Sequence, residues 1–244
     1  MSAVYETSKL LDEYLLFHFA RNDEVLPTAH EWPAPMREAL GFTRRTISHF
    51  SKTPAASGLD LGCAVGGSTF EMAKFCNTVT GIDFSQSFID AAEKIRSGEC
   101  VPYKRHEEGH VITNLVAHPP QITEGNSITF LHGDAMNLPA SLGSFDRVHA
   151  ANLVCRLPEP QRLLQRLPSL VNPGGELVLA TPCTWLAEFT PPENWPTGST
   201  FDWLLQILSP HFELQHQCDE PFLIRETARK FQWSSSLVTV WHRK

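Results

Sequence analysis

Apolar and polar positions along this chain follow two spacings, one helical and one strand-like. Apolar residues at helical spacing over 7–18 predict an N-terminal helix that Thr7 can cap, and a second amphipathic stretch covers 36–50. From Gly58 onward, short apolar runs bounded by glycine, proline or polar residues predict strands. These runs lie near 58–61, 79–84, 128–131, 145–153, 176–180 and 237–241.

Strands that alternate with helices predict an α/β fold, with a mostly parallel sheet and helices on both of its faces. Ser85 is the candidate N-cap of the helix that follows the second strand. We expect a single domain over residues 1–244, in which 1–55 form a helical cap and 56–244 form the core. An insertion with little periodicity at about 97–127 interrupts this core, and long segments of this kind are usually functional lids or mobile loops.

Composition and charge narrow the range of partners. The 244 residues are 42% hydrophobic, which suffices for one sizeable core, and the net charge is −7 without a basic run. A nucleic-acid-binding protein normally presents a positive stripe, so we expect a small-molecule substrate and no nucleic acid. The six cysteines include no C-x-x-C pair, and neither a signal pattern nor a membrane-length apolar run is seen. These features predict a reduced, cytoplasmic protein without membrane contact.

The most informative motif is a glycine-rich turn after the first predicted strand, Asp60-x-Gly62-x-Ala64-x-Gly66. Gly62 and Gly66 permit backbone conformations with positive φ that other residues resist. Asp83 ends the next predicted strand, where dinucleotide folds place the acid that binds ribose hydroxyls. We therefore expect a cofactor that contains adenosine.

The acid in front of the glycines decides between two classes of cofactor. A dehydrogenase carries G-x-G-x-x-G/A against the cofactor's pyrophosphate, which a carboxylate at Asp60 would repel. The same carboxylate suits a cationic ligand, and the pattern resembles motif I of the class I S-adenosylmethionine methyltransferases. That resemblance implies S-adenosylmethionine as the cofactor. It also implies a Rossmann-like class I methyltransferase fold with a seven-stranded sheet.

Further candidates lie at the ends of the predicted strands, because ligands of open α/β sheets bind beyond the carboxyl ends of the strands. In the methyltransferase interpretation, Asp83 accepts hydrogen bonds from the ribose diol, and Asp134 with Ala135 lies at the adenine. A glycine precedes Asp134, so a turn-forming aspartate is the alternative. Asn152 and Arg156 follow the fourth strand, and a guanidinium at position 156 can bind a carboxylate through two parallel hydrogen bonds.

Two other patterns suggest different chemistry. The run His106-Glu-Glu-Gly-His110 matches the H-E-x-x-H zinc-protease pattern, but Gly109 and the upstream Pro102 disfavour the helix that this chemistry requires. Cys155 and Cys183 could each supply a thiol, but methyl transfer from a sulfonium needs no covalent enzyme intermediate. We therefore predict no metal site and expect both cysteines to be structural.

Six segments, spread from Tyr5 to nearly the end of the chain, carry a narrower resemblance. They read YETSKLLDEYLLFHF, LDLGCAVGGSTFE, GIDFSQSFIDAA, ANLVCRL, PGGELVLATPCTWLAEFTPPENW and FLIRETARKFQW. Together they resemble the mercaptohistidine N-methyltransferase family of ovothiol biosynthesis, a module often fused behind an iron-dependent sulfoxide synthase. The family implies methyl transfer from S-adenosylmethionine to an imidazole nitrogen of 5-thiohistidine, giving ovothiol. Residues 97–126 and 197–220 match the family weakly.

The same resemblance implies a site for a zwitterionic amino acid whose ring nitrogen lies in line with the S–CH₃ bond. Arg156 or Arg225 is expected to bind the carboxylate, and Glu226 or Asp12 the ammonium. His18 is the candidate base or hydrogen-bond partner of the ring, because the ordinary pKa of histidine lies near the operating pH; the alternative is a polar residue on a helix face. The expected walls of the acceptor site are Tyr14, Phe17, Trp185 and Trp195. The expected catalytic residues are His18 and Asn152. The residues expected to bind the cofactor are Tyr5, Asp60, Gly62, Ala64, Gly66, Asp83, Phe84, Asp134, Ala135 and Asn152.

Other functions remain open from the sequence. The acceptor can be another small amino acid, an amine or a thiol, or the chain can be a non-catalytic methyltransferase-like module. The intact residues Asp60, Gly62, Gly66 and Asp83 argue against the non-catalytic module. A DNA or adenine-N6 methyltransferase is disfavoured, because ANLVCRL stands where Asn/Asp-Pro-Pro-aromatic would be expected. No sulfoxide synthase precedes the domain, so we expect a stand-alone form or an excised module, with a separate synthase supplying the thiolated histidine.

Overall fold

The computed structural model describes residues 6–244, so the predicted cofactor residue Tyr5 lies outside the described residues. The helices are α1 (Ser8–Phe19), α2 (Asn22–Val25), α3 (Ala34–Glu38), α4 (Phe42–Ile47), α5 (Gly67–Met72), α6 (Gln86–Arg96), α7 (Pro160–Leu170) and α8 (Thr200–Leu208), with short 3-10 helices η2 (Ala140–Leu142), η3 (Val154–Arg156) and η4 (Pro192–Asn194). The strands are β1 (Ala55–Leu61), β2 (Cys76–Asp83), β3 (Val101–Glu108), β4 (Val111–Ala117), β5 (Ser127–His132), β6 (Phe145–Ala151), β7 (Val171–Thr181), β8 (Phe212–Arg225) and β9 (Phe231–Arg243). Within this described part, no helix is long and apolar enough to cross a membrane.

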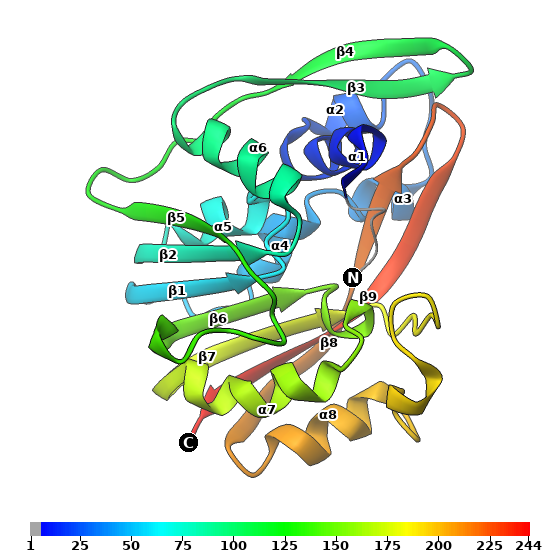
Figure 1. Ribbon diagram of the computed structural model, residues 1–244. Helices are drawn as coiled ribbons and strands as arrows, with labels where there is room; N and C mark the ends of the chain where they lie inside the picture. The colour runs from blue at the N-terminus through cyan, green and yellow to red at the C-terminus, as the bar shows by residue number, and fades with distance from the viewer. Residues whose placement is uncertain (1–5) are drawn as a thin grey trace.

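Seven strands form one sheet in the order β5-β2-β1-β6-β7-β9-β8 (Figure 1). The first five run parallel, and β9 runs antiparallel between β7 and β8. The prediction of a mostly parallel, seven-stranded α/β sheet is confirmed. From β1 the chain winds first toward β5 and later toward β7, so the strand order switches between β1 and β6. Open α/β sheets bind ligands at the carboxyl ends of the strands beside such a switch.

Side chains that alternate along the strands build a core on each face of the sheet. On β7, Val178 and Ala180 face the core that contains residues of α1, α4, α5 and α6. Leu177 and Leu179 face the opposite core, which contains residues of α7 and α8. Helices therefore cover both faces, as the alternating sequence pattern predicts.

Local sequence sets the ends of several helices. The side chain of Thr7 begins α1, and that of Ser85 begins α6; each accepts a hydrogen bond from a backbone N–H three residues on, as predicted. The amphipathic stretch at 36–50 is not one helix but two, α3 and α4. Gly41 separates them because it adopts φ +71°.

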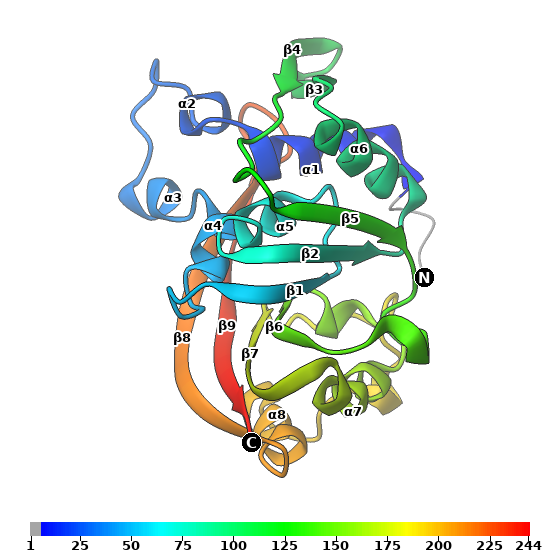
Figure 2. The ribbon, with the colours of Figure 1, turned by 90° about the vertical axis from the view of Figure 1, so that its left-hand side faces the viewer.

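Residues 97–127 do not form the aperiodic insertion expected from the sequence; they contain a second sheet, the β3–β4 hairpin. Along β3, Val101 and Tyr103 are buried while their neighbours are exposed, because only one face of the hairpin is covered. Gly109 makes the turn with φ +53°, so the segment at 106–110 is strand and turn rather than helix. Figure 2 shows this hairpin on the far side of α1 from the large sheet.

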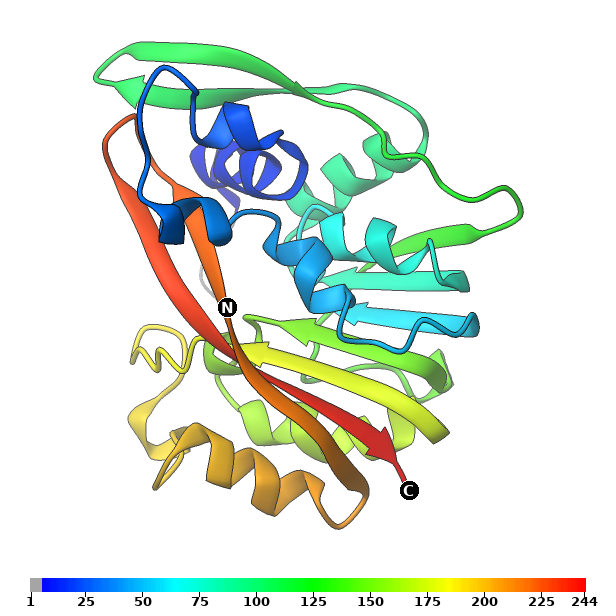
Figure 3. The same cartoon turned by 180° about the vertical axis from the view of Figure 1, so that it is seen from behind.

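The last two strands form a ribbon that is longer than the sequence suggests. The predicted final strand at 237–241 extends over 231–243, and β8 is unpredicted because this edge strand carries polar residues on both faces. The ribbon continues past the sheet to the β3–β4 hairpin (Figure 3). There the Ala228 N–H donates to the Glu107 carbonyl at 3.0 Å, and the Arg225 guanidinium pairs with the Glu107 carboxylate at 2.7 Å. The β3–β4 hairpin and the β8–β9 ribbon thereby hold α1 between them.

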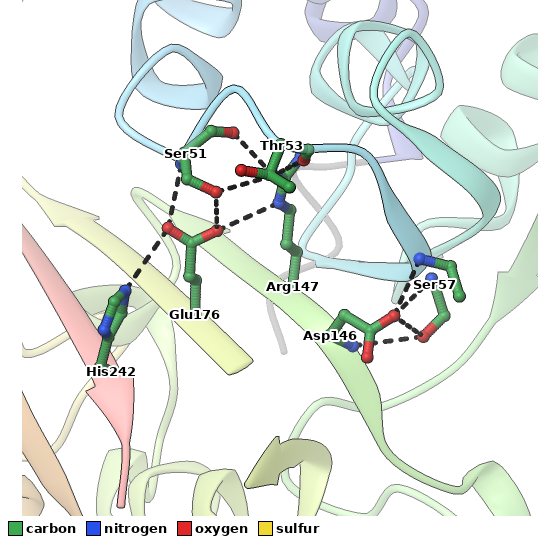
Figure 4. Close-up of polar contacts among 8 residues, drawn as sticks. Ser51, Thr53, Ser57, Asp146, Arg147, Glu176 and His242 are labelled. Atoms are coloured by element: carbon green, nitrogen blue, oxygen red, sulfur yellow. Dashed lines mark hydrogen bonds and ion pairs between the residues drawn. The ribbon is translucent and has the colours of Figure 1, made fainter. Parts of the chain in front are cut away.

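A buried polar network ties the segment before β1 to the first residues of β6 and the middle of β7 (Figure 4). Arg147 is 3% exposed and donates to the Glu176 carboxylate at 3.2 Å and to the Ser51 carbonyl at 2.6 Å. It also donates to the Thr53 carbonyl. Glu176 in turn accepts from the Ser51 N–H and hydroxyl, both at 2.9 Å. The network fixes the amino end of β1 against its neighbours, at the opposite end of the strand from the glycine turn.

Candidate active site

The backbone of the glycine turn between β1 and α5 is constrained by its neighbours. Gly62 and Gly66 have φ values of +70° and +92°, and Ala64 between them has φ +48°. The Gly62 N–H donates to the Ile82 carbonyl of β2 at 2.8 Å, which fixes the turn to the adjacent strand. A Cβ atom on Gly66 would lie 2.6 Å from the Phe130 ring. Packing within the protein, together with the positive φ, therefore requires glycine at position 66.

Asp83 lies at the end of β2 beside this turn, and backbone groups orient both of its carboxylate oxygens. Oδ2 accepts from the Ala64 N–H at 2.9 Å, and Oδ1 accepts from the Ser85 N–H at 2.8 Å. Burial raises the pKa of Asp83, although these two hydrogen bonds act in the opposite direction. Each oxygen keeps a lone pair for a ligand hydroxyl. The geometry thus suits the predicted contact with a ribose diol.

Asp60 is buried and shares its carboxylate between two protein partners. The Thr69 hydroxyl donates to Oδ2 at 2.7 Å, and Oδ1 lies 2.8 Å from His149 Nδ1. Asp60 and His149 are direct partners in the β1–β6 pairing, and His149 Nε2 lies 3.1 Å from the Thr46 hydroxyl. Asp60 therefore offers negative charge, while His149 and Thr69 set its orientation.

These groups border a pocket at the carboxyl ends of β1, β2 and β6, beside the switch in strand order. Helices α1 and α4 contribute another wall. The predicted site residues that line it are Tyr14, Phe17, His18, Asp60, Gly62, Ala64, Asp83, Phe84, Ala135, Asn152 and Arg156. Unpredicted lining residues include Phe42, Thr43, Cys63, Ser68, Phe88, His149, Leu153 and Ile224. The pocket brings most of the predicted cofactor residues together with the predicted residues of the first helix.

Among the unpredicted residues, His149 is one that the sequence pattern indicates. It is one of two buried polar residues of β6, the other being Arg147, and this strand lies next to the one that ends in the glycine turn. A buried polar side chain needs a hydrogen-bond partner, which points to the acid on the neighbouring strand. Phe42 and Thr43 gave no such signal, because the position of α4 depends on the break at Gly41.

His18 has the geometry of a hydrogen-bond donor rather than a base. The Gly67 N–H donates to His18 Nδ1 at 3.0 Å, so the proton of the neutral ring resides on Nε2. Burial lowers the pKa of His18 to about 4, and the nearby charge of Asp60 only partly opposes this effect. At neutral pH the ring is therefore uncharged. Of the two roles predicted for His18, this arrangement suits the hydrogen-bond partner.

The environment of His18 should make the free energy of unfolding depend on pH. The pKa of the ring is about 4 in the folded protein and 6.5 as its ordinary value, so the unfolded chain takes up the proton first as the pH falls. Above pH 6.5 we expect His18 to leave the free energy of unfolding independent of pH. As the pH falls from there toward the folded-state pKa, the free energy of unfolding should decrease by up to about 3 kcal/mol. Urea denaturation across this range should show a flatter profile for His18→Gln. His118→Gln, which alters an exposed ring, is the matched control; parallel profiles for wild type and His18→Gln would contradict the expectation.

Asn152 and Arg156 line the pocket just after β6. The strand ends before Asn152, earlier than predicted, because this residue adopts φ +54°. The Ser236 hydroxyl donates to Asn152 Oδ1 at 2.7 Å, which leaves the amide NH₂ group as a donor for a ligand. The Arg156 guanidinium lies 4.9 Å from the Phe189 ring centroid and donates to the Thr184 carbonyl at 2.7 Å. Arg156 thus anchors the loop after β7 while it contributes to the pocket wall.

The two tryptophans predicted as pocket walls are not part of this lining. The Trp185 indole donates to the Thr200 hydroxyl at 2.9 Å, and the Trp195 indole donates to the Thr190 carbonyl at 2.8 Å. Both side chains therefore fasten the long connection between β7 and α8. An indole N–H removed from solvent needs an acceptor; Thr190 provides one within this connection, and Thr200, the first residue of α8, provides the other.

The charged residues predicted for the substrate's ammonium, and Arg225 for its carboxylate, also lie outside the lining. Arg225 is buried in its ion pair with Glu107, where the β8–β9 ribbon meets the β3–β4 hairpin. Glu226 pairs with Lys230 at 2.6 Å near the turn of the β8–β9 ribbon. Asp12 accepts a hydrogen bond from a backbone N–H of β3 at 3.1 Å. All three engage partners within the protein that position the hairpin and the ribbon around α1.

Two predicted cofactor residues support the pocket from behind. Gly66 is the N-cap of α5, and Asp134 closes a turn by accepting from the Met136 N–H at 2.8 Å. The turn was the alternative interpretation of Asp134. Its neighbours Gly133 and Ala135 do line the pocket.

The pocket suits a ligand that combines a cation with ribose hydroxyls. Asp60 and Asp83 supply negative charge beside the glycine turn, and Phe84 presents a ring that is 43% exposed. Two carboxylates attract a sulfonium and repel a pyrophosphate. The residues of this site therefore fit S-adenosylmethionine better than a dinucleotide.

Known proteins are similar in sequence to the part of the chain that contains the glycine turn and the pocket residues of β1, β2 and β6. Residues 59–179 match the family model described as a methyltransferase domain. The ubiquinone biosynthesis O-methyltransferase of Coxiella burnetii (strain Dugway 5J108-111) is 28% identical over 123 residues, which cover 50% of this chain and 42% of that protein. The demethylmenaquinone methyltransferase of Lysinibacillus sphaericus (strain C3-41) is 27% identical over 142 residues, covering 57% of this chain and 50% of that protein. The matched region thus spans half or less of these relatives.

One solved structure shares the fold over nearly the whole chain. The N-methyltransferase NodS from Bradyrhizobium japonicum WM9, in complex with S-adenosyl-L-homocysteine, has a TM-score of 0.54 at 16% identity and covers 96% of this chain and 98% of its own. The fold, the site and the family match make this chain a class I S-adenosylmethionine-dependent methyltransferase. Residues 59–179 carry its methyltransferase domain, and S-adenosylmethionine is the methyl donor.

Proposed function

We propose that this protein transfers a methyl group from S-adenosylmethionine to an imidazole nitrogen of 5-thiohistidine (mercaptohistidine), giving ovothiol. The observation that carries the proposal is the position of α1. This helix brings Tyr14, Phe17 and His18 against the cofactor side of the pocket. The same helix belongs to a segment whose sequence resembles the mercaptohistidine N-methyltransferases.

An uncharged donor suits methyl transfer to a thiolated imidazole. The acceptor nitrogen attacks the methyl carbon with its lone pair, and the positive charge moves from the sulfonium to the ring. His18 can donate from Nε2 to the sulfur of the acceptor without placing another cation beside the sulfonium. Asp60, held by His149, stabilises the positive charge throughout the transfer. Fixing the ring nitrogen in line with the S–CH₃ bond supplies the remaining acceleration.

We assign the amino-acid carboxylate of the acceptor to Arg156. Arg156 lines the pocket and its guanidinium bonds the neutral oxygens of Thr184, whereas Arg225 pairs with the Glu107 carboxylate. The Asn152 amide lies on the same stretch of chain and offers a neutral donor to either ligand. These assignments place recognition of the acceptor on α1 and on the segment after β6.

A separate sulfoxide synthase is the partner that we propose as the source of the acceptor. The acceptor is itself a thiol, so a reducing compartment keeps it in the reactive form. All six cysteines of the protein are free thiols, which suits the same compartment, the cytoplasm.

Incubation with S-adenosylmethionine and either 5-thiohistidine, histidine or ergothioneine, followed by mass spectrometry, tests the proposal. We expect one added methyl group on 5-thiohistidine alone. Arg156→Ala should raise the acceptor KM at least about tenfold and leave that of the cofactor nearly unchanged, because hydrogen bonds to charged groups contribute about 1.5–3 kcal/mol. Arg162→Ala, at an exposed position on α7, is the control.

Other outcomes would redirect the assignment. Turnover with a different amino acid, amine or thiol, or with a phenolic acceptor, would retain the methyltransferase class and refute the acceptor. Cofactor binding without turnover on any acceptor would favour a non-catalytic partner module.

A further inference from the structure

Three metal-ligating side chains converge on the sheet edge formed by β8, outside the pocket described above. His49 follows α4, whereas His216 and Cys218 lie on β8. Their ligand atoms all lie within 4.8 Å of one another. His49 Nε2 is 3.8 Å from Cys218 Sγ, and the rings of His49 and His216 stack with centroids 5.9 Å apart.

Strand geometry explains why this cluster forms. Alternate residues of a strand share a face, so His216, Cys218 and Glu220 project on the same side of β8. This side faces the end of α4, and Figure 2 shows the two elements side by side. Glu220 Oε1 lies 2.9 Å from His49 Nε2, while its other oxygen accepts from Arg45 at 2.7 Å. The ion pair with Arg45 holds the carboxylate next to the three other side chains.

We propose that His49, His216 and Cys218 bind a thiophilic divalent cation such as Zn²⁺, with Glu220 as the nearest oxygen for a fourth position. Zinc binds imidazole nitrogen at about 2.0–2.1 Å and thiolate sulfur at about 2.3 Å in tetrahedral geometry, which separates its ligand atoms by roughly 3.3–3.8 Å. The distance between His49 Nε2 and Cys218 Sγ already falls at the edge of this range. Because His216 is exposed, its side chain can rotate and bring its ring nitrogen closer to the two other ligand atoms.

The donor set distinguishes this site from the other histidine-containing candidates in the described chain. The H-E-x-x-H segment lies in a strand and turn, so its histidines are not one turn apart on a helix. Cys100 and His118 approach within 3.4 Å, but they provide only two ligands. The β8 cluster provides three, with a carboxylate beside them.

An ion at this position would join two separate parts of the fold. It would link β8 to the segment directly after α4, and α4 carries Phe42 and Thr43 into the pocket wall. Occupancy should therefore stabilise that wall against thermal unfolding, independently of the identity of the methyl acceptor.

Zinc binding by the full chain tests the proposal. After chelation and removal of metal under reducing conditions, equilibrium dialysis against Zn²⁺ followed by elemental analysis should give one ion per chain. Cys218→Ser, His216→Gln and Glu220→Gln should each weaken binding at least about tenfold, because each removes a proposed ligand atom, and even outer-shell carboxylates contribute about tenfold or more to such sites. Co²⁺ in place of Zn²⁺ should give a thiolate-to-metal absorption band that Cys218→Ser removes.

Cys100→Ser is the matched control and should keep full zinc binding. Loss of binding in Cys100→Ser with retention in Cys218→Ser would place the ion at Cys100 and His118 and overturn the proposal. Equal binding by all variants, or no binding by wild type, would overturn it as well. Because His216 is exposed on an edge strand, His216→Gln should fold normally, and circular dichroism checks this.

Discussion

Replacing Asp83 with alanine is expected to weaken S-adenosylmethionine binding at least about 100-fold. Removal of the carboxylate would cost the ribose diol two hydrogen bonds, and hydrogen bonds to charged groups contribute about 1.5–3 kcal/mol each. It would also remove the bonds to the Ala64 and Ser85 N–H groups, which orient the glycine turn. Isothermal titration calorimetry with the cofactor measures the effect.

The fold should survive this substitution. Burial raises the pKa of Asp83, so the ionised carboxylate carries a folding cost at neutral pH that alanine removes. This gain offsets part of the loss of two backbone hydrogen bonds. Asp83→Asn should be intermediate, because its NH₂ group would face a backbone N–H. Asp90→Ala, on the exposed side of α6, is the control; unchanged affinity in Asp83→Ala would show that the ribose binds elsewhere.

Replacing Arg147 with methionine should lower the free energy of unfolding by about 3–5 kcal/mol, because it leaves a buried carboxylate without its cation. Glu176 would keep its bonds to Ser51 but lose the guanidinium, and the Ser51 and Thr53 carbonyls would lose a donor. Urea denaturation measures the loss.

A second substitution separates the ion pair from the volume of the side chain. The double variant Arg147→Met with Glu176→Leu should be less destabilised than the sum of the two single variants, because it removes both charges together. Arg162→Met, which removes an exposed pair with Glu159, should change stability by at most about 1 kcal/mol. A loss below this value in Arg147→Met would contradict the buried-pair interpretation.

Sequence patterns predict the first half of the sheet well because several local signals coincide there. The buried run of β1, the glycines at 62 and 66 and the cap at Ser85 all act within a few residues of one another. The edge strand β8 lacks such signals, because solvent lies on much of both faces. The sequence does not reveal the β3–β4 hairpin, because only one of its faces is covered, chiefly by α1, and its apolar alternation is confined to a few positions.

The site divides in the same way. The residues on its cofactor side can be predicted, because they lie at the ends of neighbouring strands and a glycine motif marks the first of these ends. Its acceptor side depends on contacts between distant segments: His18 meets the N–H of Gly67, which lies 49 positions away. No local pattern indicates which ring nitrogen makes that contact. The sequence therefore leaves both a base and a hydrogen-bond partner open at position 18, and the packed structure has a neutral donor there.

The contact between His18 and Gly67 links the proposed acceptor side of the pocket to the glycine turn. A Cβ atom at position 67 would lie 2.5 Å from His18 Nδ1, so any larger residue there displaces this ring. Packing therefore couples positions 18 and 67. A chain with alanine in place of Gly67 would need a displaced or smaller side chain at position 18, and with it a differently shaped pocket. Glycine at position 67 thus keeps the space that the His18 ring occupies, although it stands within the motif of the methyl donor.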